Sequence, residues 1–258
     1  ASDVYKRQYA AIAGKKNAKV NYQVDLIDEI WEDRPVLSEE PAFNLDVKYA
    51  GETVASKLAR IREEMKEAGT NVHVVSTLDD ICWTLNIRGN DIDFFPLVLS
   101  YGIITMDSFE LYIDERKLDD KLKAKLAKDG VNLHPYNDIY EDVKKFGSDV
   151  VAMIDPGKLN YALFNNIPEN VKTVKKRNPA ILMKAIKNPV EIENIRKAQI
   201  KDSVAHVRFM KWLKENVGKM RITEMSASDK LDEFRAEMGK FIRPSFEPIS
   251  SFGEHGAI

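Results

Sequence analysis

The stretch from Ala180 to Leu213, AILMKAIKNPVEIENIRKAQIKDSVAHVRFMKWL, decides how the chain is organised. The part before Asn188 is apolar and basic, which is typical of an extended linker or an edge strand. A helix is predicted to begin after Asn188, because this side chain can cap a helix and Pro189 suits the first helical position. Glu191 supports this start, since a carboxylate in the first turn meets free N–H groups.

The predicted helix is long and apolar on two sides. No Gly or Pro follows Pro189 before Gly218, so the helix can run for ~28 residues, or ~42 Å. A helix with two apolar faces is usually buried between layers. We therefore expect it to open a second, larger domain, most of which lies outside this chain. One face consists of Ile192, Ile195, Ala198, Ala205, Phe209 and Leu213, and the other of Ile200, Val204 and Val207.

The composition is that of an ordinary globular protein. Of 258 residues, 44% are hydrophobic and 31% charged, and the net charge is −2. This balance gives no general attraction to nucleic acid or to an anionic membrane. No apolar run approaches the ~18 residues of a membrane span. We expect neither nucleic acid nor a membrane as a partner.

The ends and the cysteine content indicate the origin of the chain. The N-terminus has no hydrophobic signal segment and no initiator Met, which predicts that the sequence begins within a protein or after processing. Residues 1–8 match no later pattern and are interpreted as a possible assembly scar. Cys82 is the single cysteine, which excludes an internal disulfide and fits a reducing, cytoplasmic location.

Between residues 51 and 174, short apolar runs alternate with amphipathic segments. This alternation predicts an α/β fold, a three-layer domain with a six-stranded and mostly mixed sheet. The expected strands cover residues 71–76, 97–105, 109–113, 131–134, 150–154 and 171–174. The expected helices cover residues 21–31, 51–69, 115–128, 137–146 and 157–165, with a short one after a capping box at Thr77.

Two further elements are expected beyond the long helix. Thr223 is predicted to cap a helix over residues 224–238, and residues 245–251 are predicted to form a strand. The rest of the sequence offers this strand no partner. We interpret the chain as a fragment of a longer protein.

The densest acidic cluster consists of Asp79, Asp80, Asp91 and Asp93. Acidic residues at this spacing can bind a hard cation. However, Asp79 and Asp80 suit the first turn of a helix, and Asp91 and Asp93 suit a loop beside Gly89. A structural role is therefore favoured over a metal site.

None of the four histidines has the spacing of a zinc site. His73 and His134 are expected on strand surfaces, and His206 as a partly exposed residue of the long helix. His255 lies in a Gly-flanked turn, where active-site loops often occur, but a lone loop histidine is more often structural or exposed. Cys82 has no basic neighbour that would form a thiolate, so we expect it in the core.

A basic run leads into the long helix. A solvated linker is favoured over a surface for an acidic partner, because apolar residues separate the charges. The sequence contains no dinucleotide fingerprint, phosphate-binding loop or nucleophile elbow. The run consists of Lys172, Lys175, Lys176, Arg177, Lys184 and Lys187.

Several long motifs follow one another from about residue 21 to the end. They are residues 25–35 (DLIDEIWEDRP), 78–92 (LDDICWTLNIRGNDI, followed by Phe95-Pro96 and Ser100-Tyr101), 184–198 (KAIKNPVEIENIRKA), 222–235 (ITEMSASDKLDEFR) and 245–258 (SFEPISSFGEHGAI). In order and spacing they closely resemble the Xaa-Pro aminopeptidases, also called aminopeptidase P, of the creatinase/pita-bread metallopeptidase family.

The resemblance implies a three-domain hydrolase that removes an N-terminal residue preceding proline from peptides. It implies creatinase-like first and middle domains, and a pita-bread third domain that holds two divalent metal ions, usually manganese, through two Asp, one His and two Glu. In that family the metals generate and orient the hydroxide that attacks the scissile carbonyl. The full-length protein is then expected to act on proline-containing peptides and to form a homodimer through its catalytic domain.

The resemblance also implies domain boundaries. Residues 1–45 correspond to the tail of the first domain, 46–182 to the middle domain and 183–258 to the start of the catalytic domain. The family's metal ligands lie beyond the last motif, and its substrate-binding histidine would follow Ile258, so His255 is not that residue. We therefore assign no catalytic, substrate-binding or metal residue to this chain, expect no cofactor in it, and expect it to be inactive alone.

A second hypothesis is a non-catalytic protein that uses the same scaffold for binding, as aminopeptidase-like domains of some histone chaperones do. The continuation of the reading frame would separate the two, since only a peptidase needs the five metal ligands. The closeness of the peptidase motifs favours the first hypothesis.

Overall fold

The computed structural model describes residues 6–18, 26–27 and 29–256. Its contacts divide the chain into two compact units, which are treated separately. The sheet unit comprises the chain up to Val47, Glu52–Asp91 and Leu97–Ile186. The hairpin unit comprises Lys48–Gly51, Ile92–Pro96 and the chain from Lys187 onward.

The sheet unit is built on six strands in the order β6-β5-β4-β2-β7-β8. Strand β4 is antiparallel to both of its neighbours, and all other pairs are parallel. This confirms the predicted six-stranded mixed sheet. The strands are β2 (Val72–Val75), β4 (Ser100–Thr105), β5 (Phe109–Ile113), β6 (Val131–His134), β7 (Val151–Ile154) and β8 (Lys172–Lys175).

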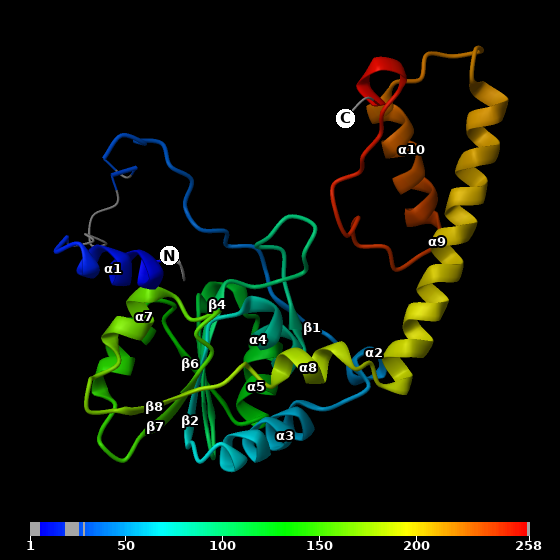
Figure 1. The fold of residues 1–258 in the computed structure, drawn as a ribbon. Helices are drawn as coiled ribbons and strands as arrows, with labels where there is room; N and C mark the ends of the chain where they lie inside the picture. The colour runs from blue at the N-terminus through cyan, green and yellow to red at the C-terminus, as the bar shows by residue number, and fades with distance from the viewer. Residues whose placement is uncertain (1–5, 19–25, 28, 257–258) are drawn as a thin grey trace. The chain divides into compact units, whose positions relative to one another are not determined.

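Helices cover both faces of the sheet, which gives the predicted three layers (Figure 1). Apolar side chains of α3 (Val54–Glu67), α4 (Leu78–Leu85) and α5 (Asp120–Lys128) pack with one face. Those of α6 (Ile139–Asp142), η2 (Val143–Lys145) and α7 (Tyr161–Asn166) pack with the other. The unit also contains the short elements α1 (Lys6–Lys15) and η1 (Glu115–Lys117). A separate two-stranded sheet is formed by β1 (Phe43–Asn44) and β3 (Ile87–Arg88). Helix α2 (Val47–Ala50) follows β1, and all of its residues except Val47 belong to the hairpin unit.

Several predicted helices are shorter than expected. The helix predicted over residues 115–128 is divided, because the Asp119 side chain accepts the N–H of Leu122 (2.7 Å) and starts α5 afresh. The one predicted over 137–146 is divided into α6 and η2. The capping box at Thr77 does not form, since its hydroxyl donates to Asp80 (2.5 Å) instead. Of the helix predicted over 21–31, residues 21–25 and 28 lie outside the described residues, and 26–27 form a turn.

The prediction of an extended linker before Asn188 is wrong. Residues Ala180–Ala185 form helix α8, and Ala180 is buried. The helix begins here because the side-chain oxygen Oδ1 of Asn178 accepts the N–H of Ala180 (3.1 Å), and Pro179 has no N–H to satisfy. Lys184 then anchors the helix by pairing with Asp79 and with Asp80 (2.7 Å).

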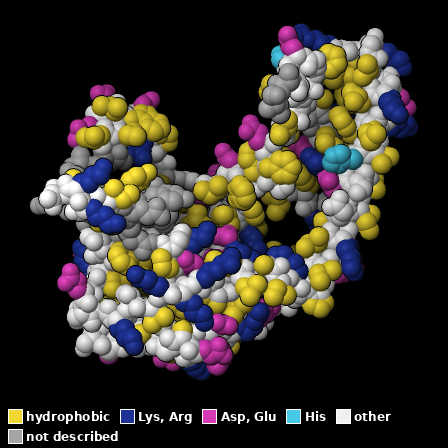
Figure 2. All heavy atoms as spheres, viewed as in Figure 1, with side chains coloured by type: hydrophobic (Ala, Val, Ile, Leu, Met, Phe, Trp, Pro, Cys, Tyr) yellow, Lys and Arg dark blue, Asp and Glu magenta, His cyan; other side chains and the backbone are white. Residues whose placement is uncertain are grey.

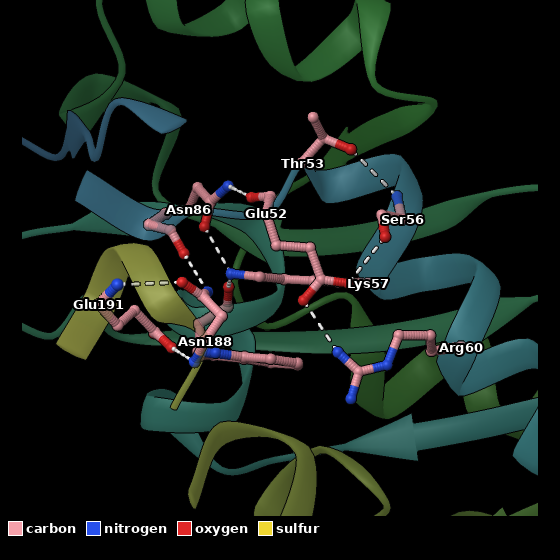
Figure 3. Close-up of polar contacts among 10 residues, drawn as sticks. Glu52, Thr53, Ser56, Lys57, Arg60, Asn86, Asn188 and Glu191 are labelled. Carbon is pink, nitrogen blue, oxygen red and sulfur yellow. Dashed lines mark hydrogen bonds and ion pairs between the residues drawn. The ribbon is translucent and has the colours of Figure 1, made fainter. Parts of the chain in front are cut away.

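The hairpin unit consists mainly of α9 (Pro189–Asn216) and α10 (Glu224–Glu237), which pack side by side (Figure 1). The predicted start of α9 is confirmed as a full capping box: the Asn188 side chain accepts the N–H of Glu191 (3.0 Å), and the Glu191 carboxylate accepts the N–H of Asn188 (2.9 Å) (Figure 3). Thr223 caps α10 as predicted.

The predicted strand over residues 245–251 is not formed. These residues are irregular, and only the short turn η3 (Gly253–Gly256) follows them. A strand exists only where a second strand accepts and donates its backbone hydrogen bonds. No strand within the described ranges lies against this segment.

The two apolar faces of α9 are largely uncovered within the hairpin unit. Ala205 is buried against α10, whereas Ile195, Ile200 and Val207 are 53%, 66% and 66% exposed. Figure 2 shows hydrophobic side chains gathered on the visible surface of this hairpin. The described residues of the hairpin unit therefore provide little of the burial that normally stabilises such a helix.

A buried lysine joins α3 to the end of α4. The ammonium of Lys57, which is only 1% exposed, donates to the carbonyl oxygen of Trp83 (2.8 Å) and to Oδ1 of Asn86 (2.7 Å), and lies over the Trp83 ring (Figure 3). Asn86 ends α4 in the left-handed conformation (φ 53°) and donates to the carbonyl oxygen of Glu52 (2.9 Å). Lys57 thus adds a charged donor to a carbonyl at a helix C-terminus, where a cation is favoured.

Replacing Lys57 with Met should lower the free energy of unfolding by about 2–4 kcal/mol, because two buried acceptors lose a charged donor. Urea denaturation monitored by tryptophan fluorescence measures this. Lys66→Met on the same helix is the matched control, since Lys66 makes only an exposed pair with Glu63 and should change stability by less than about 0.5 kcal/mol. Equal effects of both substitutions would contradict the role given to Lys57.

Amides of α9 between residues 192 and 213 should exchange with deuterium faster than those of β2. Each apolar side chain left exposed forgoes about 1.5–3 kcal/mol of burial, and β2 is buried throughout. Hydrogen exchange followed by mass spectrometry makes the comparison. Equal protection of the two segments would show that α9 buries its faces by association.

Candidate functional site

Polar side chains gather where three parallel strands end. Residues following β2, β7 and β8 line a cavity of about 420 Å³ together with α4 and α8. Ligands of α/β proteins commonly bind at the carboxyl ends of strands. This edge is therefore the first place at which to look for chemistry in the sheet unit. The lining side chains include Thr77, Asp79, Asp80, Asp155, Lys158, Arg177 and Lys184.

Asp80 is the centre of this group. It is 1% exposed, and its carboxylate accepts from Thr77 (2.5 Å), from the amide of Asn178 (2.8 Å) and from Lys184 (2.7 Å). Burial opposes the charge of Lys184, but its hydrogen bonds to Asp79 and Asp80 raise its pKa above the ordinary value. The two carboxylates are thus engaged in holding α8 on α4. The first-turn positions predicted for them are confirmed.

His73 is buried rather than on a strand surface, so that prediction is wrong. It is 1% exposed because β2 lies in the middle of the sheet with both faces covered. Its Nδ1 lies 3.1 Å from the carbonyl oxygen of Met153, and its Nε2 lies 3.2 Å from Oδ1 of Asn178. A neutral imidazole has one N–H and can donate to only one of these oxygens.

Asn178 cannot relieve this conflict by turning its amide. Its nitrogen is needed by Asp80 (2.8 Å), and its oxygen accepts the N–H of Ala180 (3.1 Å). A second proton on His73 would satisfy both oxygens, but burial disfavours the charge and lowers the pKa of His73 below 6.5, even though these acceptors and two nearby carboxylates oppose it. His73 is therefore neutral at pH 7.

Within the sheet unit, Asp91 of the predicted cluster is engaged elsewhere than Asp79 and Asp80. Asp91 forms a buried ion pair with Lys117 (2.5 Å) and accepts the N–H of Leu99 (2.7 Å). Asp93 lies in the loop that belongs to the hairpin unit. Over the described part of the chain, no three His, Cys, Asp or Glu residues are arranged to hold a metal ion. The described donors do not fit the metal centre that the resemblance implies.

The remaining histidines lie apart from this edge. His134 is half-buried on β6, as predicted, and its Nε2 lies 2.6 Å from Glu110. His206 is exposed on α9, as predicted. His255 lies in the η3 turn, where its Nδ1 is 2.9 Å from the Glu224 carboxylate at the start of α10. The hydrogen bonds that the Glu224 carboxylate makes with the backbone N–H of Phe252 and with the His255 side chain lower the pKa of Glu224.

Cys82 is buried in the core as predicted, and burial raises the pKa of its thiol to about 11. The basic run is only partly a solvated linker: Lys176 pairs with Glu64 (2.7 Å), and Lys184 pairs as described above. The sequence analysis overlooked Lys57 and Lys117. Lys57 could have been found, because it lies on the apolar side of its helix beside Val54 and Ile61; nothing local distinguishes Lys117.

The conflict at His73 predicts a dependence of stability on pH. The folded pKa lies below the unfolded value of 6.5, so the unfolded state binds the proton better and acid favours unfolding. The free energy of unfolding should level off above about pH 7.5, where His73 is neutral in both states, and fall at lower pH by up to about 1.4 kcal/mol per pH unit. Urea denaturation between about pH 5.5 and 7.5 measures the slope. His73→Asn should abolish it, His206→Asn should keep it, and a slope that survives His73→Asn would contradict the assignment.

Two family models match the chain in succession. Residues 33–191 match the creatinase/prolidase N-terminal domain, and residues 193–258 match metallopeptidase family M24. The "Probable Xaa-Pro aminopeptidase P" of Neurospora crassa is 37% identical over 246 residues, which cover 91% of this chain and 36% of the relative. "Xaa-Pro aminopeptidase app-1" of Caenorhabditis elegans is 36% identical over 241 residues, which cover 91% and 39%.

A solved structure has the same fold. A crystal structure of X-prolyl aminopeptidase from Caenorhabditis elegans, described as a cytosolic enzyme with a di-nuclear active site, superimposes with a TM-score of 0.87 at 32% identity. The match covers 93% of this chain and 40% of that one, so the chain spans less than half the length of these relatives. Within the described residues, no helix is both long and apolar enough to cross a membrane. With more than half of its residues in one family model, the chain belongs to the creatinase/prolidase N-terminal domain family and continues into the M24 metallopeptidase region.

Proposed function

We propose that this chain is part of an Xaa-Pro aminopeptidase, a metal-dependent hydrolase that removes the N-terminal residue preceding proline. The observation that carries the proposal is the continuous match to both halves of one architecture. A creatinase/prolidase domain is followed without a gap by the start of an M24 metallopeptidase, and relatives with that name are 36–37% identical over 91% of the chain.

The chain itself supplies structure rather than chemistry. The side chains nearest to a conventional site, Asp80, His73 and Lys184, are engaged with one another or with their neighbours and hold α8 in place. We propose that residues 46–182 are the middle domain, and that residues 183–258 begin the catalytic domain. The full-length protein would use two divalent metal ions, manganese being our proposal, act on proline-containing peptides in the cytoplasm, and form a homodimer through its catalytic domain.

The purified chain should not release the N-terminal residue from an Xaa-Pro-Pro peptide at any manganese concentration. The reason is that the described residues contain no cluster of three or more His, Cys, Asp or Glu side chains that could hold a metal ion. Calorimetry should likewise show no stoichiometric, tight binding of manganese or zinc. The protein encoded by the complete reading frame, assayed in parallel, should release that residue and lose the activity when the metal is chelated.

The two assays distinguish a wrong assignment of the chain as inactive from a wrong assignment of the full-length protein as a peptidase. Activity proportional to the concentration of the 258-residue chain would overturn the assignment of an inert fragment. A folded full-length protein that is inactive with manganese, zinc and cobalt would overturn the peptidase and favour the non-catalytic scaffold.

A further inference from the structure

One of the cavities lined by described residues has no role in the proposed function. It measures about 610 Å³ and lies within the sheet unit, where β5 and β6 end. Residues 114–117 follow β5, residues 135–138 follow β6, and residues 36–39 cover them. Cavities of this size at the carboxyl ends of parallel strands are the usual place for small ligands.

An exposed ion pair links the covering segment, residues 36–39, to the residues that follow β5. Arg116 binds Asp114 through Nε (3.0 Å) and Nη2 (2.6 Å), and its Nη1 reaches Glu39 (2.6 Å) from the covering segment. The hydrogen bonds from Arg116 lower the pKa of Asp114 to about 2. One arginine thus holds two carboxylates, and this group retains a negative charge.

The whole lining is also negative. It carries four carboxylates and two cations. One of the cations, Lys117, is buried and is neutralised by Asp91 (2.5 Å), and one of the carboxylates, Glu115, is paired with Lys123 (3.3 Å). Neither Asp91 nor Lys123 lines the cavity, so the excess of negative charge remains. A cavity with excess negative charge favours a cation.

Asp138 provides an anchor for such a cation. Asp138 is exposed, and within the described chain no salt bridge or hydrogen bond engages its carboxylate. Lys145 is close enough to be influenced by Asp138, but its ammonium bonds to Asp142 (2.6 Å). The Tyr136 ring also lines the cavity, and aromatic rings attract cations.

Apolar groups complete the lining. Leu99 and Ile113 line the cavity, and Val36 and Leu37 in the covering segment are 85% and 61% exposed. A ligand that covered these two side chains would remove apolar surface from water. These lining groups therefore favour a ligand that has an apolar part and one positive charge.

We propose that this cavity is a binding site for a peptide segment that carries an arginine or lysine beside an apolar residue. Asp138 pairs with the cation, Tyr136 lies against it, and Val36 and Leu37 contact the apolar neighbour. The site goes beyond the proposed peptidase function, because it lies in the sheet unit and requires no catalysis.

The test is an NMR titration of the ¹⁵N-labelled chain with acetyl-Leu-Arg-amide and, separately, with acetyl-Leu-citrulline-amide. Citrulline has nearly the shape of arginine without its charge. The arginine peptide should shift the amides of residues 36–39, 114–117 and 135–138, and should bind at least about threefold more tightly than the citrulline peptide. Shifts confined to other residues, absence of binding, or equal affinity for both peptides would overturn the proposal.

Asp138→Asn should weaken binding of the arginine peptide about threefold or more and leave the citrulline peptide unaffected. Asp229→Asn on α10 removes the same charge from an exposed residue outside the cavity and should change neither affinity. Leu37→Ser, at an exposed position, should weaken both peptides alike. If Asp138→Asn and Asp229→Asn behave identically, the carboxylate does not bind the cation and the proposal fails. Because no step needs hydrolysis, the result does not depend on the peptidase assay.

Discussion

The sheet unit depends on one buried carboxylate that needs several hydrogen-bond donors around it. Asp80 is removed from water, and an ionised carboxyl group in that position is tolerated only with several donors around it. One donor, Thr77, is local, whereas the other two, Asn178 and Lys184, lie about a hundred residues further along the chain. Satisfying Asp80 therefore fixes three segments at once, the start of α4, the end of the β8 loop and helix α8. Lys57 does the reverse at the other end of α4, where a buried cation is matched to carbonyl oxygens.

The elements that could be predicted from sequence are those stabilised locally. Asn188, Pro189 and Glu191 contain within four positions all that is needed to start α9, and the helix starts there. The strands of the central sheet are short apolar runs between turn residues, so their positions were also clear. Helix α8 follows the same Asn-Pro pair as α9, here Asn178-Pro179, and this local signal was overlooked. What no local pattern reveals is that Lys184 attaches the helix to two aspartates about a hundred residues away. The strand over residues 245–251 was wrongly predicted for a related reason: alternation describes a face, but a strand also needs a neighbour.

Burial explains which single residues could be placed correctly from the sequence and which could not. Cys82 and Asp79 behave as their local sequence indicated. The position of His73 was wrong because alternation cannot tell a central strand from an edge strand, and in a sheet covered on both sides each side chain is inside. The pairing of Asp91 with Lys117 could not be inferred, since it depends on how a loop crosses the end of β5. The family resemblance supplied what the isolated residues could not, namely that the chain spans two domains of one architecture.

The register of the central strands also determines the order in which the protein can fold. Val72 of β2 pairs with Thr105 of β4 on one side and with Ala152 of β7 on the other. During synthesis the β4–β5 pair and the α9–α10 hairpin need only neighbouring residues, whereas β2 has one open edge until β7 has been made. Contacts between distant residues form slowly, because the intervening loop must be closed first. An incomplete chain therefore presents the unpaired edge of β2, whose four residues are all buried in the complete sheet. The step most exposed to misassembly is the pairing of β7 with β2, which follows after β4 and β5 have already paired.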